Sequence, residues 1–169
     1  MKTGGVFERW VDYCPMKFTS PNAPIPRDLL GTILLSVLSG HTRYSHISEM
    51  RNDPVNASLL GMTKIVSEDA VRRGLRDNIS EEADTYWLRK TLLNTYQPIL
   101  NEDWILDVDT TIKTLYGKQE GSVVGYNHHK PGRPSHTYHS YMIANLRLIL
   151  DVDVHAGNEH ASKHTAPGI

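Results

Sequence analysis

The sequence predicts an α+β protein, with helices in residues 1–97 and strands in residues 98–169. Two patterns lead to this prediction. Before position 97 apolar residues recur at helical spacing, whereas after Pro98 they form short β-branched runs or alternate with polar residues. The 169 residues suffice for one ordinary domain or two small ones, and for a hydrophobic core. We therefore expect a helical region followed by a sheet.

The clearest helix is expected over residues 27–40, where apolar residues lie three or four positions apart and Gly40 suits the C-cap. The proline-rich residues 15–26 are expected to form a loop. Shorter helices are expected over residues 6–13, 45–50 and 56–60 and after Ser67, and a second strong helix is expected after Ser80. The buried face expected for the last of these helices consists of Ala83, Trp87, Leu88, Thr91, Leu92 and Thr95.

Residues 104–116 begin with an apolar, β-branched run that predicts a buried strand. Because side chains alternate along a strand, Asp107 and Asp109 should share one face, and Leu106 and Val108 the other. Carboxylates on a rigid strand can hold a hard cation through their oxygen atoms. The alternative is a pair of solvated carboxylates at a strand end.

Two further long strands are expected in the second half. Residues 138–144 are strand-like, and residues 122–126 form a short strand candidate before them. The third strand shows a clear period of two, which predicts a single buried face. The apolar residues of that expected face are Leu146, Leu148, Leu150, Val152 and Val154.

Composition excludes several classes of protein. The formal net charge of −1 gives no global attraction to nucleic acid or membrane, so any basic surface must be local. Cys14 is the only cysteine, which excludes a disulfide framework and suits a reducing cytoplasm. No N-terminal stretch resembles a signal peptide, and the apolar residues 29–38 are fewer than the roughly 20 of a membrane span. We expect a cytoplasmic protein without a membrane partner.

Three arginines, Arg72, Arg73 and Arg76, lie in the helix expected after Ser67. One interpretation makes this the second helix of a helix-turn-helix module, with the arginines bound to DNA phosphates. The other is a small helical bundle whose arginines are solvated. The sequence leaves both interpretations open.

Residues 127–136 form a polar loop in which Lys130, Arg133 and His136 could contact a phosphate backbone. A solvated, flexible loop is the alternative. The histidines in and after this loop also raise the question of a transition-metal site. His136 and His139 straddle the expected loop-to-strand boundary and have no cysteine partner, so we do not predict a zinc site there.

The second half carries a series of short motifs, namely residues 106–111 (LDVDTT), 116–121 (YGKQEG), 125–127 (GYN), 130–136 (KPGRPSH), 144–148 (ANLRL) and 157–159 (GNE). In this order they resemble the DDE transposases of bacterial insertion sequences. Residues 40–44 (GHTRY) and 64–69 (KIVSED) also resemble the helical N-terminal region of these enzymes. The resemblance covers nearly the whole chain.

The resemblance implies a ribonuclease H-like mixed sheet behind a helical DNA-binding region. It also implies a reaction, the two-metal phosphoryl transfer that cleaves transposon ends and joins them to target DNA, with three carboxylates holding Mg²⁺ or Mn²⁺. The first carboxylate precedes a Ser/Thr-Thr pair in this family, which places it on Asp109, with Asp107 as the fallback. The implied partners are the terminal inverted repeats and the target DNA, in a bacterial, nucleoid-associated setting.

The family's second Asp and its Glu would follow Ile169, and Asp151 and Asp153 lie within the third strand and are not assigned to either role. We therefore expect an N-terminal transposase fragment with three strands of the sheet and no catalysis of its own. The strand at Trp104 would then be an open edge that favours aggregation or homo-oligomers.

Two other functions stay open. A stand-alone fragment could bind DNA through residues 27–76 and the loop 128–136, and compete at transposon ends without catalysis. The chain could instead be a histidine-rich metal-binding protein unrelated to DNA.

Overall fold

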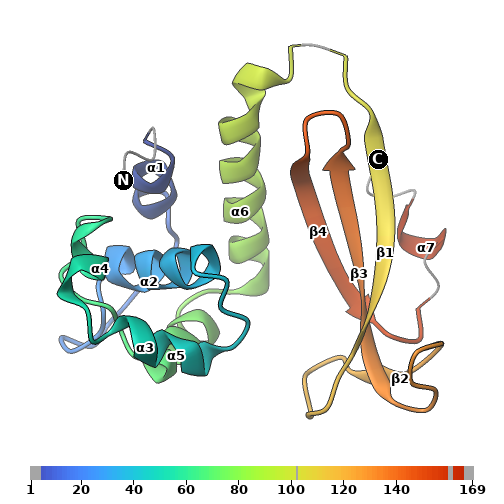
Figure 1. The fold of residues 1–169 in the computed structure, drawn as a ribbon, viewed down its shortest axis with the longest axis horizontal. Coiled ribbons are helices and arrows are strands. Elements are labelled where there is room, and N and C mark those ends of the chain that lie inside the picture. The colour runs from blue at the N-terminus through green and yellow to red at the C-terminus, as the bar shows by residue number, and fades with distance from the viewer. Residues whose placement is uncertain (1–4, 102, 160–161, 166–169) are drawn as a thin grey trace. The chain divides into compact units, whose positions relative to one another are not determined.

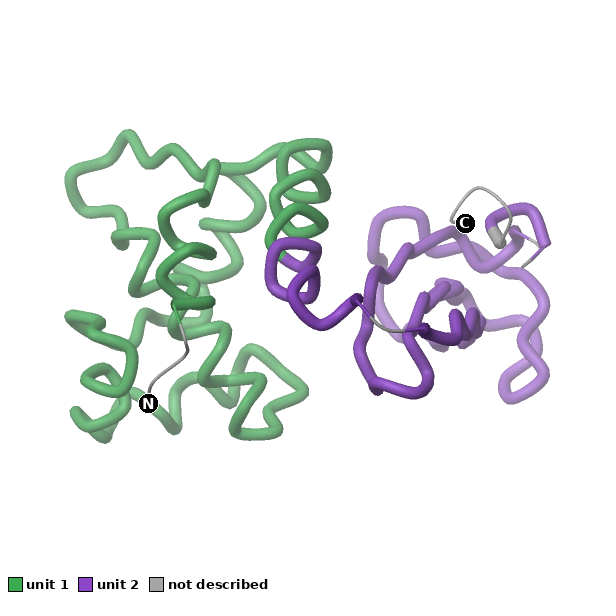
Figure 2. The backbone as a smooth tube through the Cα atoms, turned by 90° about the horizontal axis from the view of Figure 1, so that it is seen from above, with its two compact units in different colours: residues 1–91 green, residues 92–169 purple. Residues whose placement is uncertain are grey.

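The computed structural model describes residues 5–101, 103–159 and 162–165. The chain divides into two compact units, Met1–Thr91 and Leu92–Ile169, which Figure 2 colours separately. The first unit is helical and the second is built on an antiparallel sheet (Figure 1), so the α+β class is confirmed. None of the helices in the described ranges combines the length and hydropathy of a membrane span.

The helices of unit 1 follow the sequence pattern closely. Pro26 occupies the first position of its helix, where the missing N–H costs nothing, and Gly40 follows the end of that helix with φ of 74°. Ser67 caps the next long helix by accepting from the Ala70 N–H at 3.2 Å. The elements are α1 (Val6–Asp12), α2 (Pro26–Leu38), the 3₁₀ turn η1 (Tyr44–His46), α3 (Ile47–Met50), α4 (Pro54–Ser58), α5 (Glu68–Asp77) and α6 (Glu81–Tyr96), whose last residues belong to unit 2.

The hydrophobic core of unit 1 surrounds α2. Leu29 and Leu30 are fully buried, and α5 approaches so closely that a Cβ on Gly74 would lie 2.2 Å from a methyl of Leu29. Trp87 of α6 stacks on Trp10 of α1 with ring centroids 5.4 Å apart. The prediction of a buried Leu88 is wrong: the side chain is 38% exposed, because Trp87 already fills the contact that α6 makes with the core.

A buried carboxylate ties the segment before α5 to α2. Asp28 is 1% exposed and accepts hydrogen bonds from the Thr63 N–H (2.8 Å) and the Thr63 hydroxyl. One turn later, the Thr32 hydroxyl donates to the Asp28 carbonyl and accepts from the Val66 N–H at 3.1 Å. Because a buried carboxylate is tolerated only when donors surround it, these contacts fix residues 63–66 against α2.

The sheet of unit 2 is antiparallel, with β3 in the middle. β1 pairs with one edge of β3, and β4 with the other, while β2 pairs with the first residues of β3. Figure 1 shows the three long strands side by side, with α7 beside them. The elements are the 3₁₀ turn η2 (Gln97–Ile99), β1 (Leu106–Thr114), β2 (Val123–Val124), β3 (Pro134–Ile143), β4 (Leu148–Ala156) and α7 (Ser162–Thr165).

Two strand boundaries and one burial prediction need correction. β1 begins at Leu106 and lies at an edge of the sheet. Its residues alternate between half-buried and exposed, so it is not a buried strand. β3 begins at Pro134, within the residues expected to form a loop. Proline is tolerated at the first position of a strand, because no ladder hydrogen bond is required of it there.

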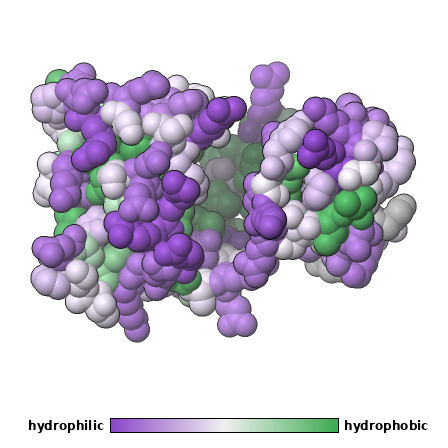
Figure 3. Space-filling view, turned by 90° about the horizontal axis from the view of Figure 1, so that it is seen from below, coloured by the Kyte–Doolittle hydropathy of each residue, from purple (hydrophilic) through white to green (hydrophobic). Residues whose placement is uncertain are grey.

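A β-bulge reverses the predicted faces of β4. Tyr141 pairs with Asp151 and Met142 pairs with Ile149, so Leu150 is an extra residue without a partner position. Beyond the bulge Val152 and Val154 therefore lie on the open face of the sheet, 45% and 49% exposed, and not on the buried face that the alternation predicted. Figure 3 shows one side of the molecular surface, on which hydrophobic residues (green) lie among hydrophilic ones (purple).

We expect Asp28→Ala to lower the free energy of unfolding by about 2–4 kcal/mol, because it removes both acceptors of Thr63 and opens a small cavity. Urea denaturation followed by tryptophan fluorescence measures the loss. Asp69→Ala is the control, since its ion pair with Arg73 is exposed and worth at most about 1 kcal/mol. Equal losses in the two variants would contradict the role given to Asp28.

Candidate functional site

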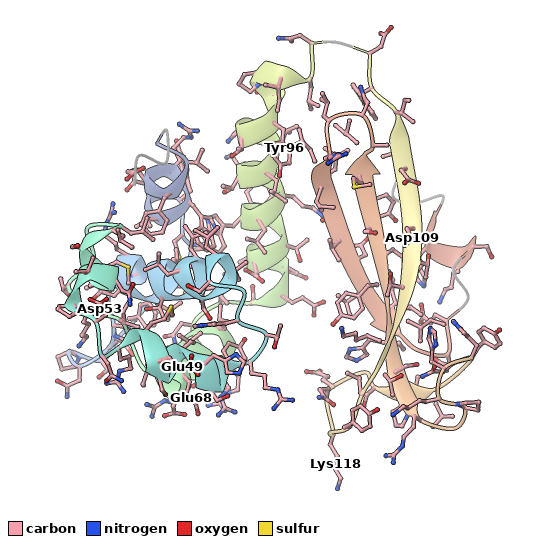
Figure 4. The ribbon with its side chains drawn as sticks, viewed as in Figure 1. Glu49, Asp53, Glu68, Tyr96, Asp109 and Lys118 are labelled. Carbon is pink, nitrogen blue, oxygen red and sulfur yellow. The ribbon has the colours of Figure 1, made fainter. Side chains whose placement is uncertain are left out.

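Asp107 and Asp109 share the open face of β1, as the strand pattern predicts. Both are exposed, and Figure 4 labels Asp109 along β1. In the ladder Asp109 lies opposite Ser140, which in turn lies opposite Val152 of β4. Asp107 lies opposite Met142. The two carboxylates therefore have neutral cross-strand neighbours and are open to solvent.

The two later aspartates of β4 cannot join this carboxylate pair. Asp151 lies opposite Tyr141, and Asp153 lies opposite His139, both on the other face of the sheet. Among the described residues, no group of three potential metal ligands includes Asp107 or Asp109. The described residues thus provide at most two carboxylates on the open face, which do not complete a two-metal site.

The three arginines of α5 each pair with a carboxylate of the same helix. Arg72 lies 3.5 Å from Glu68, Arg73 lies 2.9 Å from Asp69, and Arg76 makes two contacts with Asp77. The hydrogen bond from Arg76 holds the pKa of Asp77 below its ordinary value, and the charges of Arg76 and Arg73 lower it further. Exposed ion pairs of this kind are weak, so phosphate groups could displace the carboxylates.

The approach to α5 differs from that in a helix-turn-helix. α4 ends at Ser58 and α5 begins at Glu68, so residues 59–67 separate the two helices, whereas the motif has a turn of about three or four residues. α5 packs instead on α2.

A buried asparagine organises the loop that carries Lys130 and Arg133. The Asn127 side chain accepts from the N–H groups of His129 (3.1 Å) and Lys130 (3.0 Å) and donates to the Thr114 hydroxyl (2.8 Å). The loop therefore has a defined conformation and is anchored to the end of β1. Sequence reasoning missed Asn127, although an Asn that precedes a Pro-Gly turn is a known signal for side chain-to-backbone bonding.

Lys130 and Arg133 converge on one aromatic ring. The Lys130 Nζ atom lies 5.0 Å, and the Arg133 guanidinium carbon 5.6 Å, from the centroid of Tyr116. The ring holds two exposed cations close together by cation–π attraction. Figure 4 labels Lys118, which follows the same tyrosine at this end of the sheet. Tyr116, Lys130 and Arg133 form a compact basic surface, which we call the Tyr116 surface.

His136 is placed differently from the other predicted DNA-binding residues. It lies in β3, and its Nε2–H donates to the Glu120 carbonyl at 2.9 Å, so it fixes the turn after β1. His136 and His139 point to opposite faces of β3, because they are three positions apart and side chains alternate faces along a strand. Side chains on opposite faces of one strand cannot bind the same metal ion.

A second group of titratable residues lies on the other face of the sheet and was not predicted. Ligand atoms of His155, Glu159 and His164 lie within 4.8 Å of one another. The rings of His155 and His164 stack with centroids 3.6 Å apart, and His139 meets both rings edge-on at 5.3 and 5.5 Å. The sequence contains the spacing His-x₃-Glu-x₄-His. Because these residues span a turn and a short helix, no regular period predicts that their side chains meet.

Electrostatics in this cluster favour a neutral imidazole at His139 and an ionised carboxylate at Glu159. Burial lowers the pKa of His139, and the neighbouring His155 and His164 lower it further. Hydrogen bonds from His164 and then from Lys163 lower the pKa of Glu159. Neutral imidazole and carboxylate are the forms that ligate transition metals.

Comparisons with known proteins give no match for this chain, whether against models of protein families, curated proteins or solved structures. The site residues must therefore be judged by their own geometry.

We expect Asn127→Ala to destabilise unit 2 by about 2–3 kcal/mol, because it leaves two backbone N–H groups and the Thr114 hydroxyl without their partner. Hydrogen exchange should accelerate in residues 127–133, and thermal unfolding measures the loss of stability. Asn145→Ala is the matched control, since this exposed asparagine makes bonds that water can replace. Unchanged exchange in the loop would contradict the anchoring role.

Proposed function

We propose that this chain acts on DNA as part of a DDE-type transposition system, with Asp109 as the first of the carboxylates that hold the catalytic metal. The observation that carries the proposal is the position of Asp109: an exposed carboxylate on β1, directly before Thr110 and Thr111. Asp107 is the fallback, two residues earlier on the same face.

The order of the strands supports the proposal. The resemblance implies a ribonuclease H-like sheet in which the first three strands lie in the order 3-2-1. If the three long strands β1, β3 and β4 are numbered 1, 2 and 3 along the chain, they lie in the order 3-2-1 in the sheet. Neighbouring strands in this order are antiparallel. An antiparallel three-stranded arrangement is common to many folds, so it is the motifs on these strands that point to transposases.

The metal is proposed only as part of a larger site. Mg²⁺ and Mn²⁺ prefer oxygen ligands, which Asp107 and Asp109 provide. The two-metal reaction needs further carboxylates, and the described residues on this face do not supply them. We therefore derive no cleavage step from these residues, and expect the chain to bind transposon ends without cutting them.

The Tyr116 surface supports DNA as the partner. Its cations are exposed and held side by side, as contact with successive phosphates requires. The arginines of α5 could add phosphate contacts, but each must first exchange a carboxylate for a phosphate. We expect the Tyr116 surface to contribute more to binding than α5.

Binding of the chain to the inverted repeats that flank its own gene tests the proposal. In gel-shift titrations we expect tighter binding to the repeats than to scrambled DNA, and no cleavage with Mg²⁺. Equal, salt-sensitive affinity for both DNAs would leave only nonspecific phosphate contacts. Absence of binding to either would contradict DNA as the partner.

Removal of the cations of the Tyr116 surface should change the salt dependence of DNA binding. Lys130→Ala together with Arg133→Ala should reduce the slope of log K against log salt by about 2, one unit for each lost phosphate contact. Lys90→Ala with Arg147→Ala is the control, because it removes two exposed positive charges elsewhere. A control slope that falls equally would show that only net charge matters.

Asp109→Ala should abolish Mg²⁺-dependent cleavage of transposon ends in a longer form that carries the family's other two carboxylates. The melting temperature should stay the same, because an exposed side chain without a described partner contributes within about 0.5 kcal/mol. Asp107→Ala serves as the comparison. Cleavage that survives Asp109→Ala and is lost with Asp107→Ala would move the assignment to Asp107.

A further inference from the structure

The second cluster of unit 2 lies where β4 ends. His155 is the penultimate residue of β4, Glu159 follows in the turn, and His164 comes from α7. The turn is closed by the Glu159 N–H, which donates to the Ala156 carbonyl at 3.0 Å. The three side chains thus converge from a strand, a turn and a helix.

The protein fixes this convergence through close packing. A Cβ on Gly157 would lie 2.2 Å from the Ser135 hydroxyl oxygen, so only glycine allows the turn to approach β3 this closely. The buried Tyr141 of β3 donates its hydroxyl to the His164 carbonyl at 3.0 Å, which places α7 against the sheet.

Two ring nitrogens in the cluster have unused hydrogen-bonding capacity. The Nε2 atoms of His139 and His155 are buried and have no hydrogen-bond partner among the described residues. His139 is fully buried, and its other nitrogen, Nδ1, already contacts the Thr110 hydroxyl at 3.2 Å. Because buried polar atoms are normally satisfied, the orphaned nitrogen of His155, which lies in one group with the Glu159 carboxylate, suggests a bound species that accepts a lone pair.

We propose that His155, Glu159 and His164 bind one Zn²⁺ ion, which holds α7 against the sheet. Two imidazoles and one carboxylate are a known zinc ligand set, in which water occupies the fourth tetrahedral position. Tetrahedral zinc with bonds of about 2.0–2.2 Å places its ligand atoms about 3.3–3.6 Å apart. The three ligand atoms lie within 4.8 Å of one another, so side-chain rotations can bring them onto one ion. The contact between the His164 Nε2 and Glu159 Oε2 atoms is replaced by bonds to the metal.

This site is separate from the carboxylates of the proposed function. His155 lies opposite Thr137 on the buried face, whereas Asp109 lies on the open face. The ligands also differ in kind, since nitrogen donors favour zinc and oxygen donors favour Mg²⁺. A result that rejects the zinc site therefore leaves the assignment of Asp109 unaffected, and the reverse also holds.

Isothermal titration of the full chain with Zn²⁺, after removal of metals by a chelator, tests the proposal. We expect one ion per chain with Kd of about 1 µM or tighter, unaffected by millimolar Mg²⁺. Each of His155→Gln, Glu159→Gln and His164→Gln should weaken binding by more than about 100-fold, beyond the 10–100-fold typical of residues that only support a ligand.

His128→Gln is the matched control, since it removes an exposed histidine of unit 2 and should bind Zn²⁺ like the unchanged chain. Circular dichroism checks that each variant is folded. A wild-type chain without stoichiometric Zn²⁺ binding overturns the proposal, as does unchanged affinity in all three ligand variants.

A second measurement needs no variant and so does not depend on the folding of one. Hydrogen exchange of the full chain with and without Zn²⁺ should show slower exchange in peptides that cover the end of β4 and α7. Binding of Zn²⁺ that protects only other segments, such as residues 127–133, places the ion elsewhere and overturns the assignment.

Discussion

The bulge in β4 determines what each face of the sheet can do. Because Leu150 has no partner position, the alternation of β4 shifts by one residue, and every side chain beyond the bulge changes face. Without that extra residue Val152 and Val154 would face the buried side, and His155 would point to solvent. The bulge thus brings His155 next to His139 and creates the imidazole cluster.

The shift also leaves two kinds of candidate metal ligand on opposite faces of the sheet. The open face carries the carboxylates Asp107 and Asp109, which suit hard cations, while the buried face carries the imidazoles. The proposed Mg²⁺ ligands and the proposed Zn²⁺ ligands therefore do not compete for one ion. The proposed zinc site and the proposed role of Asp109 can therefore each be tested without the other.

The two units hold their folds by different means. Unit 1 has a hydrophobic cluster around α2, with Asp28 and Thr32 tying a loop to it. In the described part of unit 2 the fully buried hydrophobic residues are Tyr141 and Ile143, and polar groups such as Asn127 and His139 are buried with them. With so small an apolar core, the free energy of a bound metal would add substantially to the stability of unit 2.

The sequence by itself determined the local elements and the pairing of side chains on β1. Helical spacing, Ser67 as a cap and Gly40 after a helix predicted unit 1, and alternation placed Asp107 and Asp109 together, because these features depend only on neighbouring residues. The α+β class followed from the same patterns. Contacts between distant residues could not be predicted in this way.

Only the tertiary structure decided the faces of β4, the anchoring of the loop by Asn127 and the meeting of His139 with His155 and His164. A bulge depends on how two strands fit together, and it leaves the period-two pattern of each strand almost intact. The convergence of a strand, a turn and a helix likewise depends on packing across the sheet, which no local pattern encodes.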